Sequence, residues 1–210
     1  MRDQVLDPKS SRRTPSPAAP EDSASSRIDP IELARWLDEH RGRLHGRWLA
    51  GVERRAGGLS TEVRPLLGEF LEVLVDFLPA FLGPFREQVR PLWSQAAELY
   101  GSLAAMRGLA AGEVIEEFQL LREEMLRLFY DEPPVRDLDR LALRDVLRVN
   151  RVVDDGVTHA SVGHTDALFF ALFQGSGVPE TLSGEQAVEV RDQLGTVRSE
   201  FRDLMELLEE

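Results

Sequence analysis

Few residues of this chain could do chemistry, and the first to consider are its four histidines, which are His40, His45, His159 and His164. Asp155 lies four residues before His159, so the two would share one face of a helix. A metal site would also need ligands from a facing helix, such as the Glu-x-x-His pairs of di-iron bundles. No Glu-x-x-His occurs in the sequence. We therefore expect no metal and no cofactor, and we interpret Asp155 and His159 as a surface pair.

The motifs of nucleophilic and phosphate chemistry are missing. The chain has no cysteine, and it contains no Gly-x-Ser-x-Gly, no phosphate-binding loop and no dinucleotide fingerprint. Two pairs of carboxylates, Glu116-Glu117 and Glu123-Glu124, are adjacent in sequence, but adjacent helical positions diverge by about 100°. Solvated helix faces explain three of them, and Glu117 is the one we single out. We expect no catalytic residue and no enzymatic activity.

A histidine phosphotransfer protein is an alternative, because such modules are helical bundles with one reactive histidine. Their motif is similar to His-x-x-Lys-Gly, and His159-Ala-Ser-Val-Gly163 has Val162 where the lysine would stand. His164 lies beside a core position and is more simply a core histidine. A histidine phosphotransfer protein therefore remains an alternative that the sequence supports less well.

Composition limits the partners. The chain has 210 residues, 42% of them hydrophobic, and a net charge of −12. This charge argues against nucleic acid and against an anionic membrane surface as partners. No apolar run reaches membrane-spanning length and the N-terminus has no apolar signal region, so we expect a cytoplasmic protein. The single lysine, Lys9, together with abundant Ala, Leu and Gly indicates a GC-rich bacterial genome.

The apolar periodicity predicts an all-α bundle of about six helices. Residues 1–27 are rich in Ser, Pro, Ala and charge, which is typical of a disordered tail. Asp29-Pro30-Ile31-Glu32 is a strong helix start and opens a bundle over residues 28–174. Ser183 and Gln186 form a capping-box start for a coiled-coil-like helix over 183–210.

The centre of this organisation is a helical hairpin from Tyr100 to Phe129. Its first helix ends at Arg107, where a cation suits the helix dipole, and Gly108 can take the left-handed cap. Its second helix begins with acidic residues and carries a broad apolar face. Other helices must cover that face.

The last helix carries an unbroken heptad seam, in which apolar residues alternate at spacings of three and four. Packing within the chain can produce the same pattern, but the narrow seam favours a homodimer. The seam residues are Val190, Leu194, Val197, Phe201, Leu204 and Leu208.

Large aromatic residues recur at helical core spacing. They are most simply core residues, although an aromatic pocket of a small-molecule sensor would use the same types. The residues concerned are Trp36, Trp48, Trp93, Tyr100 and Phe118.

The hairpin resembles the N-terminal domain family of RsbR-type co-antagonists (the RsbRD N-terminal family), which also serves as an input domain of bacterial histidine kinases. Those domains typically have an aromatic residue or His, then Arg, then Gly, an acidic helix start and Glu-aromatic-x-x-Leu-Arg. The matching positions here are Tyr100, Gly108, Glu117, Phe118, Leu121 and Arg122. Leu33-x-x-Trp36, Gly57-Gly58-Leu59-Ser60 and Asn150-x-x-x-Asp154 are similar too, so the resemblance covers about residues 30–172.

The resemblance implies a non-enzymatic signal-transduction domain whose partner is a kinase, an anti-sigma factor or a protein with a sulfate-transporter/anti-sigma-antagonist (STAS) domain. It also implies a polar pair of Glu117 and Arg122, at least half-buried, next to Tyr100. The chain departs from the family at Ala104, where relatives often have Arg. It carries no kinase histidine box and no phosphorylatable STAS segment. Output would therefore come from a partner protein or from dimer geometry.

Overall fold

The structure is a computed structural model that describes residues 28–134, 143–173 and 182–209, and within these ranges every regular element is a helix. The all-α prediction and its six helices are confirmed. The predicted disordered tail, 1–27, lies outside the described residues. The helices are α1 (Pro30–Arg55), α2 (Val63–Leu82), α3 (Arg86–Met106), α4 (Ala111–Asp131), α5 (Leu143–Phe173) and α6 (Gly184–Glu209).

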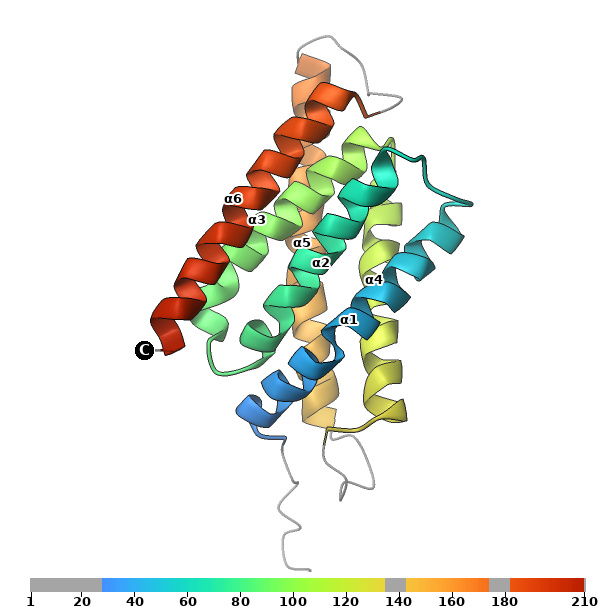
Figure 1. The fold of residues 1–210 in the computed structure, drawn as a ribbon. Helices are drawn as coiled ribbons and strands as arrows, with labels where there is room; N and C mark the ends of the chain where they lie inside the picture. Colours follow the sequence, from blue (N-terminus) through green and yellow to red (C-terminus); the bar gives the residue numbers. More distant parts are fainter. Residues whose placement is uncertain (1–27, 135–142, 174–181, 210) are drawn as a thin grey trace, which may run out of the picture.

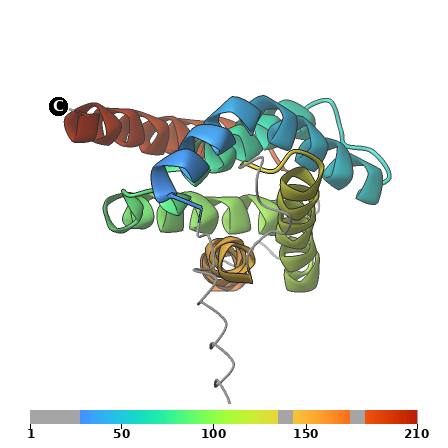
Figure 2. The ribbon, with the colours of Figure 1, turned by 90° about the horizontal axis from the view of Figure 1, so that it is seen from below.

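Helix α3 lies in the middle of the bundle (Figures 1 and 2). On one side α2 and α6 pack against it, and α1 packs on α2. On the other side lies α5, which Figure 2 shows nearly end-on while α3 runs across the view. Helix α4 bridges the two sides, because it packs on both α1 and α5. Within the described ranges, no helix combines the length and apolar character that a membrane span requires.

The helix ends follow local sequence signals. Asp29 caps α1, its Oδ1 accepting a hydrogen bond from the Ile31 N–H at 2.7 Å, and Pro30 occupies the first turn, as predicted. At the start of α6 the Ser183 N–H donates to Gln186 Oε1 at 3.0 Å, and the Gln186 N–H donates to Ser183 Oγ at 3.2 Å. This reciprocal pair confirms the predicted capping box.

Proline and glycine often interrupt helices, but they do not interrupt α2 or α5. The sequence suggests a break at Pro79, which is wrong: α2 continues past Pro79 and Phe81, ends at Leu82 and is capped by Gly83. Helix α5 is continuous through Gly156 and Gly163. These glycines are needed because the neighbouring helix is so close. A Cβ on Gly163 would overlap the backbone of Glu98, and one on Gly156 would lie 2.6 Å from the Phe118 ring.

The heptad seam of α6 is filled largely by the chain itself. Val190, Leu194 and Val197 are buried in the common core, and the Phe201 ring lies 4.2 Å from the ring of Phe77 on α2. In this packing Val190, Leu194 and Val197 face the chain's own core, and the homodimer stays a prediction from the sequence. Leu204 and Leu208 are only half-buried.

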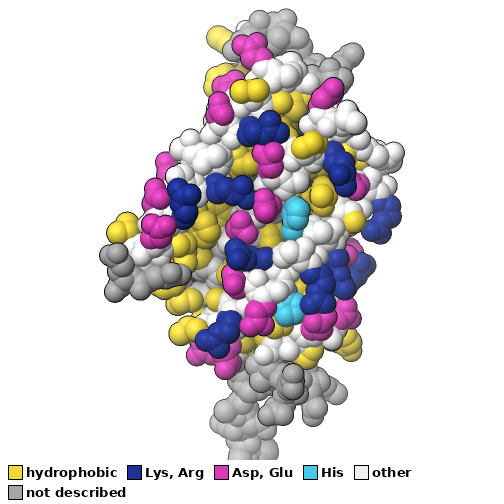
Figure 3. Space-filling model, in the orientation of Figure 1, with side chains coloured by type: hydrophobic (Ala, Val, Ile, Leu, Met, Phe, Trp, Pro, Cys, Tyr) yellow, Lys and Arg dark blue, Asp and Glu magenta, His cyan; other side chains and the backbone are white. Residues whose placement is uncertain are grey.

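Ion pairs reinforce this packing of α6. Arg191 lies 2.9 Å from Glu69, and Arg198 lies 2.6 Å from Glu72. Figure 3 shows basic and acidic side chains next to one another over the face of α1, α2 and α6. The last helix is thus a member of the bundle rather than a separate coiled-coil element.

The close approach of α3 and α5 predicts a large effect for Gly163→Ala. The added methyl group would force the α3 backbone away, so we expect the free energy of unfolding to fall by about 3 kcal/mol. Gly46→Ala on α1 is the matched control, because nothing lies within 4 Å of its Cβ position. It should gain about 0.5–1 kcal/mol by lowering the entropy of the unfolded chain. Urea denaturation measures both, and equal stabilities of the two variants would contradict the contact.

Candidate functional site at the α3–α4 hairpin

The turn between α3 and α4 is built around Gly108, whose φ is +77°. The Gly108 N–H donates to the Ala105 carbonyl at 2.9 Å, and the Leu109 N–H donates to the Ala104 carbonyl at 3.1 Å. This is a Schellman motif, and it confirms the predicted left-handed cap. The carboxylate of Glu113 accepts the Ala110 N–H at 2.8 Å and fixes the start of α4. The turn thereby sets the register between the two helices.

A buried polar cluster lies directly inside this turn. The Tyr100 hydroxyl donates to Glu117 Oε2 at 2.5 Å. Both terminal nitrogens of the Arg107 guanidinium donate to the same carboxylate, Nη2 to Oε1 at 2.9 Å and Nη1 to Oε2 at 3.2 Å. The side chains of Arg107 and Glu117 are only 5% and 4% exposed. We call these three residues the hairpin cluster.

Burial sets the protonation of the hairpin cluster. It raises the pKa of the Tyr100 hydroxyl well above its usual 10.0, and the adjacent Glu117 carboxylate raises it further. Burial alone would lower the pKa of Arg107, but the Glu117 carboxylate and Tyr100 more than offset this, so the net shift is upward. At neutral pH the tyrosine therefore stays a hydrogen-bond donor and the guanidinium stays charged.

Aromatic rings enclose the hairpin cluster. The Tyr100 ring meets the edge of Phe118 at 5.5 Å and 87°, and the Trp48 ring lies 6.0 Å from Phe118. The Trp48 indole N–H donates to the backbone carbonyl of Glu117 at 2.7 Å. These rings are fully buried against one another, so they form core packing. The alternative that they line a ligand pocket gains no support.

The structure brings together most of the predicted motif, with one correction. Leu121 is buried with Phe118 on the inner face of α4. Arg122 does not pair with Glu117: it forms an ion pair with Asp154 on α5. Five positions along a helix rotate a side chain by about 140°, so residues 117 and 122 face different neighbours.

Sequence reasoning missed Arg107 as the true partner of Glu117, because it treated this cation only as a match for the helix dipole. A usable signal was present. Tyr100 and Arg107 are seven residues apart, which places them on the same face of α3. Across a tight turn, that face meets the inner face of α4. A buried arginine there needs a carboxylate as counter-charge, and Glu117 is the acidic residue on that face of α4.

The hairpin cluster reaches the surface at a cleft of about 430 Å³ between the α1–α2 and α3–α4 turns, which Arg107 lines together with Leu59, Leu109 and Leu182. Both carboxylate oxygens are already bonded, and the tyrosine stays protonated. The cluster therefore offers no free base and no nucleophile. Its buried hydrogen bonds hold α3 and α4 together. The described residues contain no group of three His, Asp or Glu side chains placed to hold a metal.

All four histidines have partners for a ring nitrogen. His164 is buried and its Nε2–H donates to the Leu109 carbonyl at 2.7 Å, which confirms a core histidine. His159 lies 2.8 Å from Glu98 on α3, whereas Asp155 pairs with Arg90 at 3.0 Å. The predicted Asp155–His159 pair is therefore wrong, because both side chains turn toward α3.

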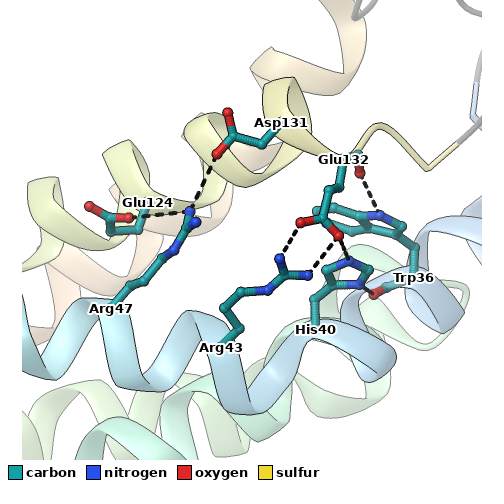
Figure 4. Close-up of polar contacts among 7 residues, drawn as sticks. All are labelled: Trp36, His40, Arg43, Arg47, Glu124, Asp131 and Glu132. Carbon is teal, nitrogen blue, oxygen red and sulfur yellow. Dashed lines mark hydrogen bonds and ion pairs between the residues drawn. The ribbon is translucent and has the colours of Figure 1, made fainter.

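His40 belongs to a second polar network, which joins α1 to the end of α4 (Figure 4). The Glu132 carboxylate accepts hydrogen bonds from Arg43, with Nη2 to Oε2 at 2.8 Å, and from His40 at 3.3 Å. Its backbone carbonyl accepts the Trp36 indole N–H at 2.8 Å. The hydrogen bond from Arg43, with that from His40 and the charges of both, lowers the pKa of Glu132 from 4.5 to about 2.

The variant Glu117→Gln tests how much the hairpin cluster stabilises the fold. It leaves the Arg107 guanidinium buried without a counter-charge, so we expect the free energy of unfolding to fall by about 3 kcal/mol. The triple variant Tyr100→Phe, Arg107→Met and Glu117→Leu makes the cluster apolar and should recover most of this loss. Urea denaturation compares the variants. If the triple variant is no more stable than Glu117→Gln, packing rather than charge controls the site.

The lowered pKa of Glu132 predicts a pH dependence. The unfolded chain binds the Glu132 proton more readily than the folded one, so this pair stabilises the fold above about pH 4.5 and is lost as pH falls toward 2. The Tm difference between the natural chain and Arg43→Gln should therefore shrink over that range. Arg54→Gln removes the same charge from an arginine with no carboxylate partner among the described residues, and its Tm difference should not change. A pH-independent Arg43→Gln difference would contradict the assignment.

Comparison of the chain with known proteins found no relative. A scan against protein-family models matches no family, a search of curated proteins finds no match, and a search of solved structures finds no match. The resemblance to RsbR-type co-antagonists therefore remains an expectation from the sequence. The functional conclusion depends on what the described residues can bind.

Proposed function

We propose that this chain is a non-enzymatic regulatory domain of a bacterial signalling pathway, and that it acts by binding a partner protein. The observation that supports this proposal is the end of α5. Four large apolar residues there are 62% to 82% exposed, and we call them the aromatic end of α5: Phe169, Phe170, Leu172 and Phe173. Monomeric proteins rarely leave such a group in water unless it contacts something.

A groove adjoins the aromatic end of α5. It has a volume of about 370 Å³, and Phe170 and Ala171 of α5 form one wall while Val190 of α6 forms the other. In Figure 1 the end of α5 and the start of α6 lie together at the upper end of the bundle. The rings of Phe169 and Phe173 stack with their centroids 6.3 Å apart, so one face of the helix is already ordered. An amphipathic helix suits such a groove.

Charge around the groove defines the partner further. Asp166 and Glu189 line it, and among the described residues neither has an arginine within 4.0 Å. The partner helix should therefore flank its apolar face with Lys or Arg. A second copy of this chain would bring the same acidic rim, so electrostatics disfavour a symmetric homodimer at this surface.

The resemblance adds the class of partner, which is a kinase, an anti-sigma factor or a STAS protein. The closed hairpin cluster agrees with a regulatory role, because it offers no reactive group. The phosphotransfer alternative gains no support from the described residues, because His164 is buried and Val162 stands where the motif has lysine.

Site-specific photo-crosslinking tests the proposal. Benzoylphenylalanine replaces Phe170 in the organism that encodes the chain, and in a matched strain it replaces Tyr130, which is 86% exposed at the far end of α4. We expect an adduct at position 170 and none at 130. Mass spectrometry should identify the adduct as a regulator crosslinked through an amphipathic segment with Lys or Arg.

The variant Phe169→Ser with Phe173→Ser serves as the control for specificity. It should reduce the adduct at least tenfold and leave the Tm nearly unchanged, because both side chains are exposed. An adduct of two copies of the chain would replace the partner by a homodimer. The absence of any adduct at position 170 would refute the docking surface.

A further inference from the structure

A second cleft lies at the opposite end of α5, with a volume of about 550 Å³. The first turns of α5, the end of α2 and the start of α1 meet around it, at the lower end of the bundle in Figure 1. Four arginines line this cleft, namely Arg86, Arg144, Arg148 and Arg151. We call it the arginine cleft. Such a cluster is unexpected in a chain with 37 acidic and 25 basic residues.

Most arginines of the described chain have a carboxylate within 4.0 Å. The exceptions among the described residues are Arg35, Arg54, Arg86, Arg144 and Arg151, and the last three line the arginine cleft. Their positive charges therefore line one cleft, and no carboxylate of the described residues lies within 4.0 Å of these three side chains. Like charges that line one cleft repel one another, and a bound anion would reduce that repulsion.

The other features of the cleft hold these groups in place. Arg148 donates to the Leu82 carbonyl at 2.7 Å and lies 3.6 Å from the buried carboxylate of Asp145. The Arg86 guanidinium lies over the Phe81 ring, 5.4 Å from its centroid. The Nε of Arg86 is buried and has no hydrogen-bond acceptor among the described residues. One nitrogen of this guanidinium therefore lacks an acceptor among the described residues, while the Arg86 side chain lines the cleft.

The geometry points to a small organic diphosphate as the ligand. An organic diphosphate carries up to three charges, which matches three guanidinium groups that have no carboxylate partner among the described residues, and its oxygens fit their paired donors. Leu147 and Val152 form an apolar part of the wall, which an organic group would cover. The cleft volume is in the range of small-molecule sites. A flat anionic membrane fits poorly, because the cleft is concave and the chain is acidic.

This inference does not depend on partner docking at the aromatic end of α5. The two surfaces share α5 but no residue. A failure of one therefore leaves the other standing, and the two experiments read out different quantities.

Isothermal titration calorimetry of the full chain tests the inference, with pyrophosphate, ADP and geranyl diphosphate as probes at about 0.15 M salt. We expect saturable binding of pyrophosphate, and tighter binding of the organic diphosphate whose organic part fits the apolar wall. The two organic probes distinguish a nucleoside from an aliphatic chain. Equal affinity for all three probes would overturn the organic part of the assignment.

The test variant is Arg144→Gln with Arg151→Gln, which changes two exposed side chains and should fold normally. It should weaken diphosphate binding at least tenfold. The control is Arg35→Gln with Arg54→Gln, which removes the same charge from two arginines that also lack a carboxylate partner but lie outside the cleft. Its effect should be below twofold. An equal loss in both variants would mean that only net charge matters and would overturn the site.

Two further probes exclude other occupants. Vesicles with phosphatidylglycerol test a lipid surface, and a hexaglutamate peptide tests an acidic protein. Binding of either one without binding of pyrophosphate would overturn the diphosphate assignment. The absence of any saturable binding of the three diphosphates would also overturn it.

Discussion

The contact between α3 and α5 is the constraint on which the rest of the structure depends. Gly101 faces the backbone of Ala160, and Gly163 faces the backbone of Glu98, so the two helices meet without side chains between them. Ser102 Oγ donates to the Gly163 carbonyl at 3.1 Å across the same contact. Because α5 lies this close, His164 reaches the Leu109 carbonyl and α4 can pack on both α1 and α5.

The hairpin cluster shows how a buried charge specifies one arrangement of helices. A guanidinium and a carboxylate in the interior stabilise the fold only when both find each other in good geometry. Any slip of α4 relative to α3 would leave Arg107 or Glu117 buried without its partner. Apolar residues alone would tolerate such a slip more easily. The cluster therefore contributes specificity of register, and its closed hydrogen bonds explain why it offers no chemistry.

Sequence reasoning predicted the helices well, because apolar periodicity, the Asp29 cap and the Gly108 turn are local signals. It located the buried motif through Tyr100 and Glu117 but paired Glu117 with Arg122, since the true partner depends on how two helices face each other. It assigned the α6 seam to a dimer because a heptad pattern does not tell which helix fills it. The arginine cleft was not foreseen at all, since α2 and α5 meet there from positions about 60 residues apart.

Helix α5 is held at its middle, where Gly156 lies against aromatic rings and Ala160 and Gly163 lie against the α3 backbone, while its two ends adjoin different surfaces. At 1.5 Å per residue, the first residue of α5 lies about 20 Å from this region and the last about 15 Å. These close contacts oppose sliding of α5 along its axis. A tilt of about 5° displaces each end by roughly 1.5 Å, in opposite directions. Because α5 is one continuous helix, a tilt that moves its first turns also moves its last turns.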